Sequence, residues 1–420
     1  MNAKFVRLSR RSALAAGFVL AITGITSAVP VSADPAAAPA AVAKPGVVLD
    51  ANSPTAVPDS YIAVLADSNA SADVVKRRSE ETRQKYGVSI TQTYYSALRG
   101  FAVKATADQA ARLATDPVFE YVTADQEVTT DALAVQASPP SWGINRIDER
   151  SLPLDTKYHY ANTASTVTAY IIDTGIRYTH QEFGGRAIYG IDVVGGVFPP
   201  GNDCYGHGTH VAGTVGGKTV GVAKDVQLVS VRVLNCSGSG TLAGVIAGVD
   251  WVTNDTIING RKSVANMSLG AAGVWPTLNT AVGNSVAANV HYSVSAGNGA
   301  TLACNQSPAS APAATTVGST ETNDARSTFS NYGSCVDIFA PGRQIYSALN
   351  TSDTAYGLKD GTSMAAPHVT GTAALWRHKF PTNTAWQTAA ALTDNATPGV
   401  VGGAGAGSPN KLLFSGFVPA

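Results

Sequence analysis

The 420-residue sequence has no excess of charge of either sign. Its 29 Lys and Arg residues balance 29 Asp and Glu residues, and charged residues make up only 14% of the chain. No block of basic residues stands out, so the electrostatic footprint that nucleic-acid binding requires is missing. Hydrophobic residues make up 45% of the chain, which excludes an intrinsically disordered protein and is enough for a large core beside a smaller domain.

Long hydrophobic runs are missing beyond the N-terminus. The first 33 residues combine a basic start, an apolar stretch and a small-residue ending at Val31-Ser32-Ala33, and polar residues, glycine and proline interrupt the apolar stretch. This pattern is typical of a cleaved export signal rather than a membrane span. We therefore expect a secreted protein without a membrane anchor.

Cysteine is scarce, with four residues in the whole chain: Cys204, Cys236, Cys304 and Cys335. No CxxC pair occurs and the spacings are long, which argues against a zinc site. In an exported chain an even number of cysteines favours disulfides, and four cysteines allow three connectivities. Sequential pairing, the first with the second and the third with the fourth, would close two loops of roughly 30 residues, each worth on the order of 3 to 4 kcal/mol.

The first third of the chain predicts a small α+β unit. An Ala- and Pro-rich stretch at 34–50 is typical of a linker. Between residues 59 and 128, strand-like runs alternate with helical patterns. The strands are expected at 59–67, 97–106 and 119–128, and the helices at 71–87 and 107–117.

The rest of the chain predicts an α/β fold. Runs of β-branched residues that end in Gly, Asn or Asp alternate with helices rich in small residues. The strands are expected at 165–175, 225–234, 262–270 and 289–298, and the helices at 241–255 and 277–290. This alternation indicates a mostly parallel sheet with helices on both faces, whose ligand site lies at the carboxyl ends of the strands.

The stretch CYGHGTHVAG at 204–213 contains two of the seven histidines, His207 and His210. Three positions apart on a helix, both rings would lie on one face. Taken alone, the pair fits a metal site, a catalytic base beside a packed ring, or two packed rings.

Three further polar residues stand where a strand or helix is expected to begin or end. Asp173 closes the apolar run YIIDTG, Asn298 closes SVSAGN, and Ser363 precedes a small-residue helix. Each has an ordinary structural explanation, such as a cap. Together with His207, however, they provide a nucleophile, a base, a carboxylate to orient the base, and an amide donor for an oxyanion.

Several motifs resemble those of the subtilisin-like serine proteases: IIDTG, GHGTHVAG, SLG, SAGN and GTSMAAPHVTG, in the same Asp, His, Ser order. WGINRIDERSLPL, ANMSLG, SNYGSCVDIFAPG and GSPNKLLFS are similar to the proteinase K branch, closest to its aqualysin-type secreted bacterial members. The resemblance runs from Trp142 to the C-terminus. It implies a three-layer α/β/α fold, a monomeric secreted endopeptidase that acts on polypeptides, and sequential pairing of the four cysteines.

The resemblance also implies a role for each polar residue. Asp173 would orient His207, which would act as general base and then general acid. Ser363 would attack the scissile carbonyl, and Asn298 with the backbone N–H of Ser363 would bind the oxyanion. His210 would be a packed helix residue without a chemical role.

Substrate binding is implied at two glycine-containing edges that pair with a peptide as an added strand. The first edge comprises Ser237, Gly238, Ser239 and Gly240, and the second comprises Ser268, Leu269 and Gly270. The small residues Ser295, Ala296 and Gly297 would form the floor of the first specificity pocket. We expect broad specificity with an apolar or aromatic preference, and simple glycine loops are the alternative interpretation of the two edges.

The resemblance implies structural calcium and no organic cofactor. One site would use the Asp337 carboxylate with the backbone carbonyls of Pro312 and Ala314, which are hard oxygen ligands suited to Ca²⁺. A second site would lie near Asp148 and Glu149, where exposed loop carboxylates are the alternative interpretation.

The 59–128 segment resembles the inhibitor-type propeptide of the same family, which implies that it helps the protease fold and then blocks its cleft. ALAVQ ahead of SPPSWG predicts cleavage after Leu133. The expected division is an export signal at 1–33, a propeptide at 34–133 and a peptidase domain at 134–420.

Two other functions fit less well. An α/β-hydrolase esterase is disfavoured because no GxSxG surrounds Ser363 and the Asp, His, Ser order is wrong for that class. A catalytically dead module kept as a binding or scaffold protein has nothing in its favour, because every triad position is filled.

Overall fold

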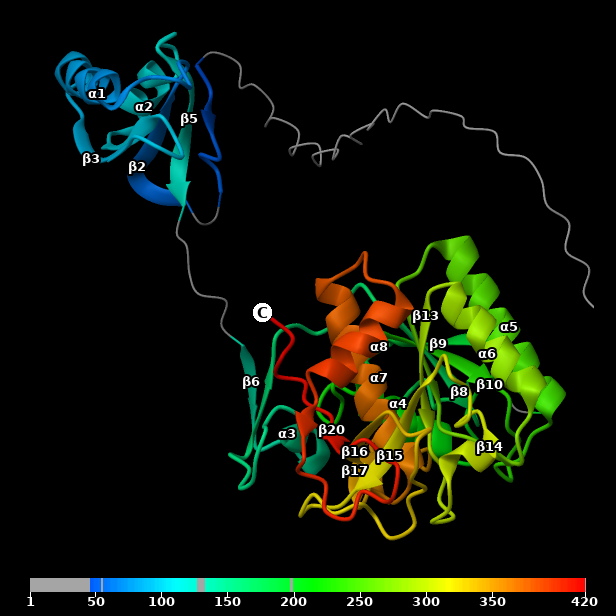
Figure 1. Cartoon of the computed structure of the whole chain (residues 1–420). Coiled ribbons are helices and arrows are strands. Elements are labelled where there is room, and N and C mark those ends of the chain that lie inside the picture. The colour runs from blue at the N-terminus through cyan, green and yellow to red at the C-terminus, as the bar shows by residue number, and fades with distance from the viewer. Residues whose placement is uncertain (1–45, 54–55, 127–132, 197–198, 420) are drawn as a thin grey trace, which may run out of the picture. The chain divides into compact units, whose positions relative to one another are not determined.

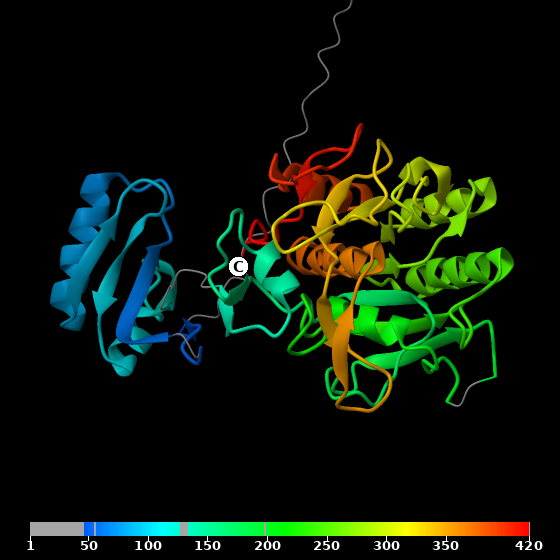
Figure 2. The ribbon, with the colours of Figure 1, turned by 90° about the horizontal axis from the view of Figure 1, so that it is seen from below.

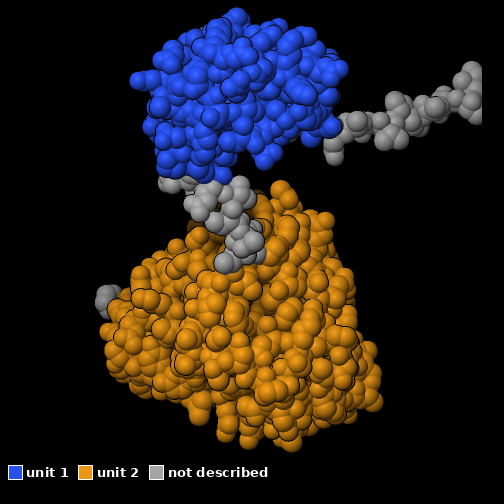
Figure 3. Space-filling view, turned by 90° about the vertical axis from the view of Figure 1, so that its left-hand side faces the viewer, with its two compact units in different colours: residues 1–129 blue, residues 130–420 orange. Residues whose placement is uncertain are grey.

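The computed structural model describes residues 46–53, 56–126, 133–196 and 199–419. The chain divides into two compact units, Met1–Thr129 and Thr130–Ala420 (Figure 3). The predicted export signal lies outside the described residues. Among the helices that the structure describes, none has the length and apolar character needed to cross a membrane.

The smaller unit is a five-stranded sheet, in the order β1-β5-β2-β4-β3, with two helices (Figure 1). Its elements are β1 Val48–Leu49, β2 Ala56–Leu65, α1 Ala72–Tyr86, β3 Ser89–Tyr94, β4 Gly100–Lys104, α2 Ala107–Leu113 and β5 Phe119–Gln126. Side-chain caps at Ser71 and Thr106 begin the two helices. The linker prediction is wrong at its end, because Val48 and Leu49 pair with β5 as a parallel strand.

The larger unit is built on a nine-stranded sheet in the order β19-β20-β16-β15-β13-β11-β8-β10-β9. All neighbouring strands are parallel except β19 and β20. The strands are β8 Thr168–Asp173, β9 Ala187–Asp192, β10 Gln227–Arg232, β11 Ser263–Met267, β13 Val290–Ser295, β15 Thr315–Thr320, β16 Ile338–Pro341, β19 Thr397–Pro398 and β20 Lys411–Leu412. Three antiparallel pairs stand beside it: β6 Ala134–Ala137 with β7 Lys157–Tyr160, β12 Ala271–Ala272 with β14 Gln306–Ser307, and β17 Ile345–Ala348 with β18 Tyr356–Lys359.

Helices cover both faces of this sheet, so the predicted three-layer α/β/α fold is confirmed (Figures 1 and 2). The helices are α3 Trp142–Ile147, α4 His207–Gly216, α5 Leu242–Asn259, α6 Pro276–Ala287, α7 Thr362–Lys379 and α8 Ala385–Asp394, with a 3₁₀ turn at Ala303–Asn305. Side chains of β8 alternate between two cores. Ala169 and Ile171 pack in the core shared with α4 and α7, whereas Tyr170 and Ile172 pack in the core shared with α5 and α6.

Two disulfides tie loops of the larger unit together: Cys204 to Cys236 and Cys304 to Cys335. The first joins the segment that leads into α4 to the loop that follows β10. Bridges of this kind restrict the unfolded chain more than they strengthen the folded one.

Candidate active site

Asp173 and His207 form a hydrogen-bonded pair at the carboxyl end of the sheet. Asp173 is the last residue of β8 and is fully buried, and its two carboxylate oxygens lie 2.8 and 2.9 Å from His207 Nδ1. The backbone N–H of Thr174 donates a further bond of 2.7 Å to Asp173 Oδ1. A buried carboxylate requires such partners. The pairing keeps the proton on Nδ1 and leaves Nε2 of His207 as a proton acceptor.

Opposing effects set the pKa of His207. Burial lowers this pKa, but the negative charge of Asp173 and its hydrogen bond together outweigh burial, and the pKa lies above the ordinary histidine value. The ring is one fifth exposed, so a substrate can reach it. The raised pKa means that Asp173 stabilises the imidazolium that forms when the ring takes up a proton.

Ser363 stands at the start of α7, where Gly361 precedes the helix with a φ of 149°. Ser363 Oγ donates a hydrogen bond of 3.1 Å to the carbonyl oxygen of Ser268, and Ser268 Oγ donates one of 2.7 Å to the Ser363 carbonyl. Among the residues that the structure describes, no hydrogen bond joins Ser363 to His207. Transfer of the serine proton to the ring therefore requires the hydroxyl to turn away from Ser268.

Asn298 lies beyond β13 with its side-chain amide held in one orientation. Its Oδ1 accepts bonds of 2.9 Å from both the backbone N–H and the hydroxyl of Thr362. The Asn298 Nδ2 group is therefore left as a donor. A Cβ added at Gly361 would lie 3.5 Å from both Asn298 Nδ2 and the backbone N of Ser363, so the two nitrogens lie near the same point.

His210 takes no part in the hydrogen bonds between Asp173 and His207. It is fully buried, its Nε2 lies 3.2 Å from the carbonyl oxygen of Gly357, and burial lowers its pKa to about 3. The rings of His207 and His210 thus have separate partners. Nowhere among the described residues do three or more His, Cys, Asp or Glu side chains gather as a metal site.

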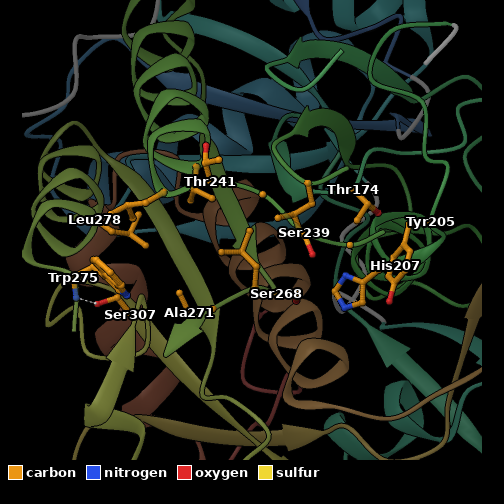
Figure 4. A pocket seen from close by; sticks show the side chains of 17 residues that line it. Thr174, Tyr205, His207, Ser239, Thr241, Ser268, Ala271, Trp275, Leu278 and Ser307 are labelled. Atoms are coloured by element: carbon orange, nitrogen blue, oxygen red, sulfur yellow. Dashed lines mark hydrogen bonds between the residues drawn. The ribbon is translucent and has the colours of Figure 1, made fainter. Parts of the chain in front are cut away.

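A cavity of about 620 Å³ extends from His207 between the two predicted substrate edges (Figure 4). Figure 4 shows His207 and Tyr205 at one end of the cavity and Trp275 and Leu278 at the other, with Ser268 between them. Of the predicted substrate residues, Gly238, Ser239, Gly240, Ser268, Leu269 and Gly270 line it. Ser237, Ser295, Ala296 and Gly297 are not among its lining residues.

Local geometry explains the glycines of the first edge. Gly238 has a φ of 75°, in the left-handed region, and a Cβ there would lie 2.9 Å from the ring of Tyr205. Asn235 Oδ1 accepts bonds from the backbone N–H groups of Ser237 and Ser239, which fixes the loop. The backbone of this edge is therefore conformationally restricted, and its role in substrate binding stays a prediction.

Sequence reasoning missed several residues that shape this site. Tyr205 and Trp275 line the cavity, and Thr362 orients the amide of Asn298. Trp275 immediately precedes Pro276, the first residue of α6, so it falls outside any helical pattern. Tyr205 stands in the stretch CYGHGTHVAG and Thr362 in the GTS motif, but these motifs drew attention to His207 and Ser363 instead.

Comparison with known proteins identifies the family to which the chain belongs. Residues 164–411 match the profile of the subtilase family, and residues 47–131 match that of peptidase inhibitor I9. The chain belongs to the subtilase family.

The similarity extends over most of the subtilase chain. An extracellular serine proteinase of a Thermus species is 47% identical over 398 residues, which cover 90% of this chain and 95% of that protein. Alkaline serine exoprotease A of Vibrio alginolyticus is 42% identical over 381 residues, with 88% and 70% covered. The crystal structure of a cold-adapted subtilisin-like serine proteinase matches with a TM-score of 0.62 and 50% identity, over 65% of this chain and 97% of that one.

This subtilase is therefore an extracellular serine endopeptidase with an inhibitor-type propeptide domain. The predictions of family, fold and secretion are confirmed.

Subtilases typically bind structural calcium, and the surroundings of Asp337 fit that ion. A cavity of about 260 Å³ is lined by Asp337, Pro312 and Ala314 among others. Burial raises the pKa of Asp337 to about 6, and its Oδ2 accepts one hydrogen bond of 2.7 Å from the backbone N–H of Thr316. A buried carboxylate beside backbone oxygens is a hard donor set of the kind that Ca²⁺ prefers.

At Asp148, protein donors occupy one carboxylate oxygen, whereas Oδ1 is buried without a hydrogen-bond partner among the described residues, and burial raises the pKa of the carboxyl to about 6. Asp148 Oδ2 accepts a bond of 2.6 Å from the backbone N–H of His159 and lies 2.9 Å from His159 Nδ1. Glu149 Oε1 accepts a bond of 2.7 Å from the backbone N–H of Asp155. The two carboxylates thus have separate protein partners, and calcium at this place stays a prediction.

Proposed function

We propose that this subtilase hydrolyses peptide bonds through Asp173, His207 and Ser363 by way of an acyl-enzyme. The buried Asp173–His207 pair carries the proposal, because it positions a neutral imidazole at the groove that Ser268 lines, and Ser268 is hydrogen-bonded to Ser363. A serine hydroxyl is a poor nucleophile until such a base takes its proton.

The geometry supports the following order of steps. Ser363 Oγ bonds to the scissile carbonyl carbon while its proton passes to His207 Nε2, and Asp173 stabilises the imidazolium. The carbonyl oxygen becomes an oxyanion, which accepts bonds from Asn298 Nδ2 and the Ser363 N–H. His207 then gives its proton to the leaving amine as the C–N bond breaks. Water, deprotonated by His207, cleaves the acyl-enzyme in the same manner.

We propose that the substrate is an extended polypeptide that lies between the two edges as an added strand. Main-chain pairing depends little on the substrate's side chains, which gives broad specificity. The cavity between the edges is lined by apolar side chains, namely Leu234, Leu242, Val245, Leu269 and Leu278. An apolar or aromatic preference follows from this lining.

The kcat/KM of the mature enzyme should fall as the pH decreases through the pKa of His207. The base works as the neutral ring, and Asp173 raises its pKa, so the acidic limb should have its midpoint above about pH 6.5, the ordinary histidine value. The measurement is kcat/KM for a chromogenic peptide against pH, with enzyme returned to neutral pH and assayed again to exclude unfolding. A reversible midpoint at or below that of free histidine would contradict the assignment.

We propose that the small unit acts as an intramolecular inhibitor and folding aid until the enzyme cuts it away. The secreted form should begin at Ala134, the first residue of β6, because cleavage after Leu133 places an apolar side chain in the first specificity pocket. N-terminal sequencing of the secreted protein measures this directly. A start beyond Trp142 would rule the prediction out, since it would remove β6 and the beginning of α3.

We propose that calcium at Asp337 stabilises the fold without taking part in catalysis. A chelator should lower the unfolding temperature while leaving kcat at low temperature unchanged, because an ion that binds only the folded state contributes about 2.7 kcal/mol at 100 times its dissociation constant. Asp337→Asn should remove most of the calcium dependence of unfolding. Loss of turnover by the chelator in a protein that stays folded would show that the role is not structural.

A further inference from the structure

A second buried carboxylate, Asp203, lies in the loop that leads into α4. The residue is only 5% exposed, and five donors converge on its side chain. Oδ1 accepts bonds from the hydroxyl of Thr174 at 2.9 Å and from the backbone N–H groups of Tyr205 and Gly206 at 2.9 and 2.7 Å. Oδ2 accepts bonds from the backbone N–H and hydroxyl of Thr209 at 2.9 and 2.6 Å.

These bonds connect the strand that ends in Asp173 with the helix that begins at His207. Thr174 follows Asp173 directly, and its hydroxyl oxygen also accepts a bond of 2.9 Å from the backbone N–H of Gly208. Gly206 and Gly208, which flank His207, are therefore both tied to the same small network. Asp203 is the member of the network that spans the gap between the two elements.

The charge of Asp203 also acts on His207. No Lys, Arg or His pairs with Asp203 among the residues that the structure describes, so its negative charge is balanced only by hydrogen-bond donors. Asp173 at the end of β8, Lys359 in β18 and His210 in the same helix also act electrostatically on His207, and Tyr205 lies at the same end of the groove (Figure 4). Asp173 and Asp203 raise the pKa of His207, and Lys359 lowers it.

We propose that Asp203 is a positioning residue for peptide hydrolysis. It fixes the positions of Asp173 and His207 relative to each other and adds a second negative charge beside the base. The inference rests on the role proposed above for His207. Asp203 itself is not among the residues that line the groove, so it acts on the reaction through the imidazole.

Asp203→Asn should lower kcat by roughly 10- to 100-fold, because small displacements of a catalytic group have effects of this size. The asparagine keeps the shape of the side chain, but its amide nitrogen cannot accept the two bonds from Thr209. The loss of charge should also move the acidic limb of kcat/KM to lower pH, since a negative charge that raises the pKa of His207 is gone. KM for a short peptide should change little.

Thr174→Val tests the positioning role of Asp203 separately from the effect of its negative charge. It removes the hydroxyl that donates to Asp203 and accepts from Gly208 but leaves the carboxylate in place. This variant should lower kcat without moving the acidic limb. Asp255→Asn is the matched control, because Asp255 is a mostly buried carboxylate that accepts bonds from Tyr170 and Asn259 and pairs with Arg261 away from the groove. The control should leave kcat and the acidic limb unchanged.

The experiment compares these variants, expressed as the full chain, by pH-dependent kcat/KM and by thermal unfolding after inactivation with a fluorophosphonate. A folded Asp203→Asn enzyme whose kcat and acidic limb match those of the control would overturn the inference. If that variant does not fold, unchanged kcat in Thr174→Val overturns it instead. Either failure leaves Ser363-dependent turnover intact, whereas turnover that survives Ser363→Ala would mean that the proposed mechanism itself is wrong.

Discussion

Ser363→Ala should lower kcat by on the order of 10⁶, the loss known for removal of the triad serine or histidine of subtilisin. The substitution removes the only atom that the proposed mechanism bonds to the substrate, and the remaining groups can at most polarise the carbonyl. The expected results are no measurable release from a chromogenic peptide and a precursor that stays uncleaved at Leu133–Ala134. Steady-state kinetics and the mass of the secreted protein test both.

Ser352→Ala is the matched control for this loss, because Ser352 is an exposed serine in the loop between β17 and β18. It should leave turnover and processing unchanged. Turnover above about 1% of wild type in a folded Ser363→Ala protein would contradict the acyl-enzyme mechanism, since removing a triad serine costs far more than that.

Asn298→Ala should lower kcat by about 10²- to 10³-fold with a smaller change in KM. This is the loss known for the oxyanion asparagine of subtilisin, equivalent to about 2.7 to 4 kcal/mol of transition-state stabilisation. In the proposed mechanism, Nδ2 donates to an oxygen that carries full negative charge only in the transition state. Steady-state kinetics on a peptide ester and a peptide amide measure the effect.

Asn298→Asp is the sharper companion variant. The aspartate keeps an oxygen that can accept both bonds from Thr362, so the backbone and the start of α7 stay in place. It replaces the Nδ2 donor with a second oxygen, so kcat should fall at least as far as in the alanine variant. A folded Asn298→Asp enzyme with wild-type kcat would show that the donor is not used.

The sequence predicted four strands of the larger sheet, β8, β10, β11 and β13, because they are buried on both faces, and it did not predict the more exposed edge strand β9. Continuous β-branched runs mark such strands, and β8, β10, β11 and β13 all lie within the predicted ranges. The predicted ranges are too wide, because residues such as Val233 and Leu234 continue the apolar pattern after the strand has ended. The two-residue strand β1 was missed because it depends on pairing with β5, more than seventy residues later in the chain.

In the candidate site too, residues in short local motifs could be predicted, whereas residues that act through distant contacts could not. The residues expected to react, Asp173, His207 and Ser363, stand in short motifs that combine a reactive group with a strand or helix end. The roles of Asp203 and Thr362 depend on contacts across the fold, such as the bond from Thr362 to Asn298, which spans 64 residues. No periodicity or local spacing reports contacts of that kind.

The most direct test of the account is covalent labelling of the secreted enzyme with a fluorophosphonate, followed by peptide mass spectrometry. An activated serine should react once, so the account predicts a single adduct on Ser363, little labelling in His207→Ala, and none in Ser363→Ala. An adduct on another residue, or labelling that persists in Ser363→Ala, would contradict the claim that Ser363 is the nucleophile.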